Sequence, residues 1–111
     1  MQYFSSTSAL AEARELELPE LEARALAIIG ASRGSSGDSG GRADLERSIE
    51  ITEQIDSPLA SHHCGMLADL ECSYGNLASC FELQRRARGH AERFGHVGHI
   101  QWLKAELAAE Y

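Results

Sequence analysis

Two stretches of this chain carry small residues and turn residues in the same order. Gly30 is followed seven residues later by Gly37, and Ala68 is followed seven residues later by Gly75. The offset from Gly30 to Ala68 is therefore the same as the offset from Gly37 to Gly75. Self-similarity at a fixed period is the sequence signature of a repeat architecture, in which each unit buries its apolar face only against the next unit.

A second set of small residues follows the same repeat. Gly41 and Ser48 correspond to Cys80 and Ala87, at an offset one residue longer than that of the first set. Small residues allow two helices to cross closely, and a glycine at a reversal permits a left-handed backbone conformation. The pattern therefore predicts helical hairpins, with close helix crossings and with turns at Gly37 and Gly75.

Between the breaks, apolar residues recur at helical spacing. About six helices are expected, at 6–17, 20–33, 42–56, 58–74, 77–94 and 97–110. Alanine and leucine dominate the apolar content, and both favour helices. The Gly/Ser-rich stretch 34–41 is expected to be too poor in helix formers to stay helical, and so to form the longest loop. In the segment 77–94, the residues expected on the apolar stripe are Leu77, Phe81, Ala87, Ala91 and Phe94.

The pattern resembles the tetratricopeptide repeat (TPR) family, whose unit is about 34 residues long. The resemblance implies an all-α fold, an α-α superhelix of antiparallel hairpins, as a single domain over 1–111. Complete hairpins would span 20–56 and 58–94, with partial repeats at both ends. The chain departs from the family at Arg33 and Glu71, where the family often has tyrosine. Its repeat period is also longer, which implies longer connections between helices.

Two segments look like the repeat regions of large regulators from high-GC bacteria: RADLERSIEITEQIDSP and HAERFGHVGHIQWLKAELAAEY. Those regulators join such repeats to nucleotide-cyclase, ATPase or DNA-binding domains. The resemblance implies that the chain is a fragment or a stand-alone relative of a bacterial regulatory protein. The incomplete end repeats lead us to expect that the helix at 97–110 docks on a second copy and forms a homodimer.

Charge and composition exclude several classes of function. The formal net charge of −7 argues against binding nucleic acid through a global field. No apolar run approaches the roughly 20 residues that span a bilayer. The first residues lack the features of a secretory signal, and three cysteines without framework spacing suggest free thiols. A cytoplasmic protein without membrane contact is expected.

Histidine and cysteine residues raise the question of a metal site. His62, His63 and Cys64 are consecutive, and His96 and His99 are three residues apart. Neither set has a carboxylate at a fixed spacing, and His63 falls on an apolar stripe, so a buried core histidine is the preferred interpretation. We therefore expect no metal and no cofactor. A small-molecule or metal-responsive sensor that uses His and Cys residues is the alternative function.

No grouping of acid, base and nucleophile is evident, so an enzyme is not expected and no catalytic residue is assigned. The arginines of helix 77–94 are the most specific indication of a binding function, because guanidinium groups bind carboxylates in bidentate fashion. Pairing with Glu82, Glu92 or the acidic helix around Glu50 and Glu53 is the preferred interpretation. Capture of an acidic partner is the alternative.

The predicted function is therefore protein–protein interaction. In the TPR family the first helix of each hairpin lines the binding groove, which here implies helices 20–33, 58–74 and 97–110. Candidate contacts with a protein or peptide partner combine groove positions and the arginine cluster: Arg24, His62, Asp69, Arg85, Arg86, Arg88 and Gln101.

Overall fold

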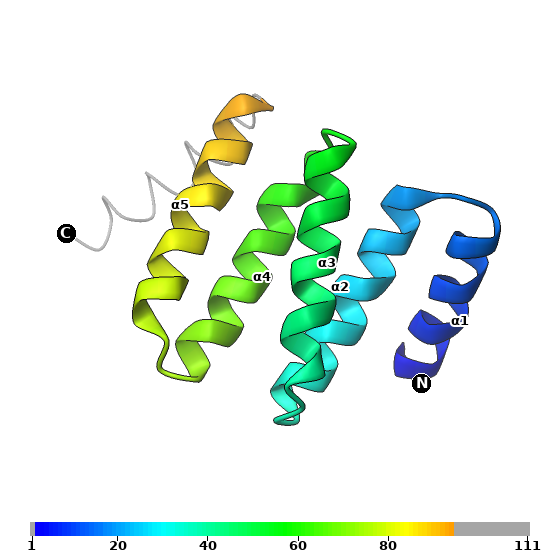
Figure 1. Cartoon of the computed structure of the whole chain (residues 1–111), viewed down its shortest axis with the longest axis horizontal. Coiled ribbons are helices and arrows are strands. Elements are labelled where there is room, and N and C mark those ends of the chain that lie inside the picture. Colours follow the sequence, from blue (N-terminus) through cyan, green and yellow to red (C-terminus); the bar gives the residue numbers. More distant parts are fainter. Residues whose placement is uncertain (1, 95–111) are drawn as a thin grey trace.

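A computed structural model describes residues 2–94 of the chain. Within these residues the structure is all-α, with five helices: α1 (Gln2–Glu15), α2 (Pro19–Ser35), α3 (Gly40–Gln54), α4 (Leu59–Ser73) and α5 (Leu77–Arg93). The helices pack as antiparallel hairpins, α2 with α3 and α4 with α5, and α1 packs on α2 (Figure 1). The predicted fold class is confirmed. The helix predicted at 97–110 lies outside the described residues.

All four reversals between these helices use the same turn. One residue in each has a left-handed backbone: Glu17 (φ 55°), Gly37 (φ 86°), Asp56 (φ 52°) and Gly75 (φ 81°). The next residue in each turn donates its backbone N–H to a carbonyl five positions earlier, over 2.8 to 2.9 Å. This is the Schellman arrangement, which satisfies carbonyls at a helix end. The turns are almost equally spaced along the chain, in agreement with the repeat.

Short polar side chains and proline start the helices that follow these turns. Pro19 occupies the first position of α2, where a missing N–H costs nothing. Asp38 accepts the backbone N–H of Gly40 at the start of α3 over 2.8 Å. Ser57 accepts the N–H of Leu59 at the start of α4 over 3.2 Å. These bonds satisfy donors that have no partner within the helix.

Helices α2 and α3 take in both ends of the Gly/Ser-rich stretch, and the prediction of a long loop over 34–41 is wrong. Helix α2 continues to Ser35 and α3 begins at Gly40, so only four residues separate them. The reason is packing: a Cβ on Gly34 would lie 2.6 Å from Leu70 Cδ2, and one on Gly41 would lie 2.5 Å from the carbonyl oxygen of Gly30. Packing of the helices outweighs the low helix propensity of these glycines, and the neighbouring helix leaves room for nothing larger at either position.

The main core lies between α3, α4 and α5 and reaches α2. It is formed by small and branched side chains: Ala27, Leu45, Ile49, Cys64, Leu67, Ala68, Leu70, Cys80 and Leu83. Buried Ser48 donates to the carbonyl of Leu45 over 2.7 Å, so its hydroxyl is satisfied inside α3. Of the small residues predicted at helix crossings, Gly30, Gly41, Ser48 and Ala68 are buried as expected, whereas Ala87 is only partly buried.

The predicted orientation of α5 is wrong at two positions. Leu77 and Phe81 are 54% and 64% exposed, whereas Cys80 and Leu83 are buried. Successive residues of a helix are rotated by about 100°, so that Phe81 points away when Cys80 faces the core. On α2, Leu21 and Ile28 are also about half exposed.

Candidate functional site

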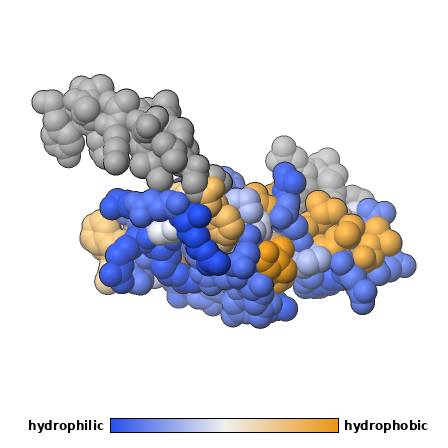
Figure 2. Space-filling view, turned by 90° about the horizontal axis from the view of Figure 1, so that it is seen from above, coloured by the Kyte–Doolittle hydropathy of each residue, from blue (hydrophilic) through white to orange (hydrophobic). Residues whose placement is uncertain are grey.

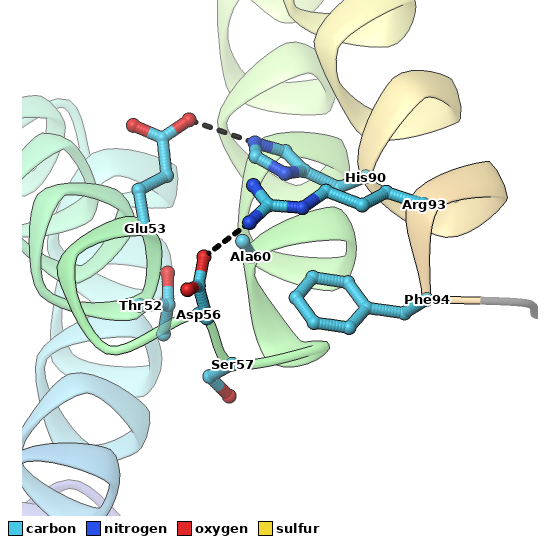
Figure 3. A pocket seen from close by; sticks show the side chains of 8 residues that line it. All are labelled: Thr52, Glu53, Asp56, Ser57, Ala60, His90, Arg93 and Phe94. Atoms are coloured by element: carbon cyan, nitrogen blue, oxygen red, sulfur yellow. Dashed lines mark hydrogen bonds and ion pairs between the residues drawn. The ribbon is translucent and has the colours of Figure 1, made fainter.

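Three helices, α3, α4 and α5, meet around a small pocket. The pocket has a volume of about 240 Å³ and lies between the C-terminal ends of α3 and α5 and the start of α4 (Figure 3). Its lining combines two acidic, two basic and two hydroxyl side chains with a phenylalanine and an alanine: Thr52, Glu53, Asp56, Ser57, Ala60, His90, Arg93 and Phe94.

Glu53 is the centre of the polar network at this pocket. Its Oε2 lies 2.7 Å from Nε2 of His90, as Figure 3 shows. Arg86 donates to both carboxylate oxygens of Glu53, over 3.0 and 2.9 Å. Partial burial alone would raise the pKa of Glu53, but the hydrogen bonds from Arg86 and His90 outweigh burial and lower it. Glu53 is therefore a carboxylate that joins α3 to α5.

The rim of the pocket carries a second ion pair. Arg93 on α5 lies 2.7 Å from Asp56 in the turn after α3. Both side chains are about 60% exposed, so the pair contributes little to stability. The Phe94 ring points into the pocket (Figure 3), and the guanidinium carbon of Arg93 lies 5.6 Å from its centre.

Cys64 does not line the pocket but lies close to Glu53 and His90, which do. One ligand atom each from Glu53, Cys64 and His90 lie within 4.8 Å of one another. Cys64 is fully buried, and burial raises the pKa of its thiol to about 11. A nucleophilic cysteine requires a lowered pKa, so this environment does not favour a catalytic thiol.

Sequence analysis did not predict that Glu53, Cys64 and His90 lie close together. The three residues come from three different helices, and no fixed spacing connects them until the hairpins are in register. Cys64 was paired with its neighbours His62 and His63 instead. Consecutive residues of a helix do not face one another, and the structure turns His62 outward and His63 inward.

His63 is a buried core histidine, as preferred from the sequence. It is 2% exposed, and its Nδ1 has no hydrogen-bond partner in the structure. Burial lowers its pKa to about 4, assisted by the charges of His62 and Arg24. His63 is consequently neutral at pH 7.

The candidate partner contacts fall on two surfaces. Arg24, His62 and Asp69 are exposed on α2 and α4. Arg85 pairs with Glu82 over 2.6 Å and Arg86 pairs with Glu53, as the preferred interpretation of the arginine cluster predicted. Arg88 is exposed. Gln101, like the histidines at 96 and 99, lies outside the described residues.

Helices α2 and α4 contact each other and present equivalent positions on one surface. Arg24 and His62 are separated by the repeat offset, and Ile28 and Met66 are separated by the same offset. We define the α2/α4 face by residues at equivalent positions of these two helices: Leu21, Arg24, Ile28, Leu59, His62 and Met66. Leu59 and Met66 are partly buried, and Met66 also packs against the core. Ile28 and Leu21 are 48% and 49% exposed, so the face is both apolar and basic.

On the face seen in Figure 2, the hydrophobic surface is divided into separate areas. The view in Figure 2 shows separate apolar patches on a mainly hydrophilic surface. At the turn between α1 and α2, Leu16 and Leu18 are 65% and 41% exposed. Among the helices of residues 2–94, none combines the length and the apolar character that crossing a bilayer requires.

Comparisons of the chain with protein-family models, with curated proteins and with solved structures gave no match. The assignment to the TPR family is therefore a prediction from the sequence, and the all-α hairpin fold is the part of it that the structure supports.

Proposed function

We propose that this protein is a protein-binding module of TPR type, and that its partner binds on the α2/α4 face. The observation that carries the proposal is the repetition of side-chain types at equivalent positions of α2 and α4, with Arg24 matched by His62 and Ile28 matched by Met66. Half-exposed apolar residues near a basic residue suit a peptide or helix that carries an apolar anchor and an acidic group.

The resemblance to bacterial regulators supports a role in signalling or transcriptional regulation. In that role the module would bring a partner protein to the rest of a regulatory assembly, without catalysing a reaction. The arginines of α5 are a less suitable surface, because Glu82 and Glu53 already neutralise Arg85 and Arg86.

The test is a photo-crosslinking residue placed at position 28, followed by identification of the crosslinked segment of the partner. A synthetic peptide of that segment is then titrated against purified variants by fluorescence anisotropy. Arg24→Glu and Ile28→Asp should each weaken binding at least tenfold, whereas the control Arg88→Glu should leave it unchanged. Loss of binding in Arg88→Glu alone would move the site to the arginine cluster and contradict the proposal.

Self-association through the open ends of the repeat stack is the second part of the proposal. The exposed Leu16 and Leu18 at the α1–α2 end support it, while the helix predicted at 97–110 lies outside the described residues. Light scattering coupled to size exclusion should give a dimer mass that Leu16→Ser converts to a monomer mass. A monomer mass for the parent chain over a wide concentration range would exclude this part.

A metal-responsive sensor is the second candidate function. The grouping of Glu53, Cys64 and His90 favours it over a small-molecule sensor, because these residues offer three different ligand atoms within one small volume.

A further inference from the structure

Three side chains with metal-binding chemistry converge at the junction of the two hairpins. Glu53 comes from α3, Cys64 from α4 and His90 from α5, and their ligand atoms all lie within 4.8 Å of one another. No two of them are neighbours in the sequence, so their proximity is a product of how the second hairpin packs on the first. Glu53 and His90 are partly exposed, and Cys64 is buried.

We infer that Glu53, Cys64 and His90 form a binding site for a divalent transition-metal ion, best suited to zinc. A carboxylate oxygen, a thiolate sulfur and an imidazole nitrogen are the ligands that zinc takes in proteins. Usual bond lengths to zinc place tetrahedral ligand atoms about 3.3 to 3.6 Å apart. The contact between Oε2 of Glu53 and Nε2 of His90, 2.7 Å long without an ion, would have to open by about 1 Å, and Cys64 would have to approach by about 1 Å.

Binding at this site releases a proton from Cys64. The ion replaces the thiol hydrogen: Zn²⁺ and Cys–SH give a zinc–thiolate bond and a proton that passes to solvent. Ligation by cysteine requires the thiolate, so that loss of this proton accompanies binding of the ion.

Arg86 lies beside the carboxylate ligand as a second partner. It donates to both Oε1 and Oε2 of Glu53. When Oε2 binds the ion, Oε1 remains available to Arg86. Outer partners of this kind orient a ligand carboxylate and keep it ionised.

The coordination sphere would stay open toward the pocket. Glu53 and His90 line the pocket, whereas Cys64 does not, so the third ligand approaches from the core side. Three protein ligands leave a fourth tetrahedral position for water or for a donor atom of a bound molecule. The pocket of about 240 Å³ offers space for either one.

Metal binding would connect both hairpins through one ion. Glu53 belongs to the first hairpin, and Cys64 and His90 belong to the second. An ion bound to all three stabilises the folded chain, because the unfolded chain does not hold these ligands together. This inference is independent of the proposed partner site, since the α2/α4 face includes none of the three ligands.

Cobalt is the probe that tests the site, because Co²⁺ reports both thiolate ligation and tetrahedral geometry by absorption. The reduced full-length chain is titrated with Co²⁺ in metal-free buffer, and Zn²⁺ is then added as a competitor. One equivalent of Co²⁺ should produce a thiolate-to-cobalt band and intense visible bands, and Zn²⁺ should remove both. The melting temperature should rise with one equivalent of Zn²⁺.

Variants assign the ligands. Cys64→Ser should abolish the thiolate band, and Glu53→Gln and His90→Gln should each weaken binding by about tenfold or more. The matched controls Cys72→Ser and His62→Gln change the same residue types outside the cluster and should leave the titration unchanged. Cys72 is a demanding control because its thiol acts on the pKa of Cys80, so that these two residues offer a second pair of thiols.

Two results overturn the inference. One is the absence of a thiolate band at one equivalent of Co²⁺. The other is a band that persists in Glu53→Gln and His90→Gln and disappears in Cys72→Ser, which would place the ion at Cys72 and Cys80. If Cys64→Ser fails to fold, the Glu53→Gln and His90→Gln variants decide the question. Both side chains are partly exposed, so these variants should fold, and circular dichroism of each variant verifies this.

Discussion

The hydroxyl of Tyr74 donates a hydrogen bond to the backbone carbonyl of Gly34 over 2.6 Å. Tyr74 caps the C-terminus of α4 and Gly34 belongs to the last turn of α2, so this bond joins the first helix of one hairpin to the first helix of the next. Leu70 packs against the same glycine.

Tyr74→Phe removes only this hydrogen bond. We expect the free energy of unfolding to fall by about 1 kcal/mol, the usual net value of one hydrogen bond. Urea denaturation followed by circular dichroism measures the change. Leu77→Ala, an exposed substitution at the start of α5, should have a smaller effect. An equal loss in both would show that this end of the hairpin as a whole is sensitive.

Two glycine substitutions should have opposite effects. Gly41→Ala forces a methyl group against the backbone of Gly30 and Gly34, and such overpacking costs about 1–3 kcal/mol. Gly65→Ala, inside α4 with no atom within 4 Å of the new Cβ, should stabilise the chain by up to about 1 kcal/mol. Thermal unfolding of both variants checks the sign, and stabilisation by Gly41→Ala would contradict the close crossing of α2 and α3.

The left-handed turns predict a further pair of opposite changes. Glu17→Gly should raise the free energy of unfolding by about 1 kcal/mol, because glycine adopts a positive φ without steric cost. Gly75→Ala should lower it by about 1–2 kcal/mol. Chemical denaturation measures both, and an unchanged stability in Gly75→Ala would mean that the turn adopts another conformation.

His63 predicts a pH dependence of stability. Its pKa is about 4 in the folded chain and has the ordinary value of 6.5 in the unfolded chain, so the unfolded chain binds the extra proton first as the pH falls. Stability from this group is complete above pH 6.5 and is lost as the pH falls from 6.5 toward 4. The chain should be about 2 kcal/mol less stable at pH 5 than at pH 7 on this account.

Urea denaturation of the parent and of His63→Leu at both pH values tests this assignment. The loss between pH 7 and pH 5 should be smaller in His63→Leu, which also removes the unpaired Nδ1. His62→Gln, on the exposed neighbour, should keep the full pH dependence. An equal loss in the parent and in His63→Leu would assign the effect to other groups.

The hairpins were predictable because their signals are local. The helical periodicity of apolar residues and the repeat that relates Gly37 to Gly75 fix which residues are helical and where the chain reverses. The error at 34–41 arose because helix propensity, about 1 kcal/mol for each glycine, was given more weight than tertiary packing. Gly34 and Gly41 lie inside helices that only glycine allows to approach so closely.

The grouping at the hairpin junction was not predictable in the same way. Glu53, Cys64 and His90 meet only because α5 is rotated so that Cys80 faces the core and Phe81 faces outward. The sequence pattern of α5 is compatible with Cys80 or with Phe81 facing the core. It therefore does not determine on which side of the helix His90 lies. Distances between hairpins depend on this rotation, and no local spacing encodes it.

The near-equal spacing of the left-handed turns has a consequence for how such a chain lengthens. Consider a duplication of the segment from one left-handed turn to the second turn after it. It would add one hairpin, and the turns at both of its ends would match those of the neighbouring hairpins. Growth in whole hairpins would thus leave every existing joint intact, whereas an insertion of any other length would break the phase between adjacent units. The architecture constrains evolution of its length to discrete steps.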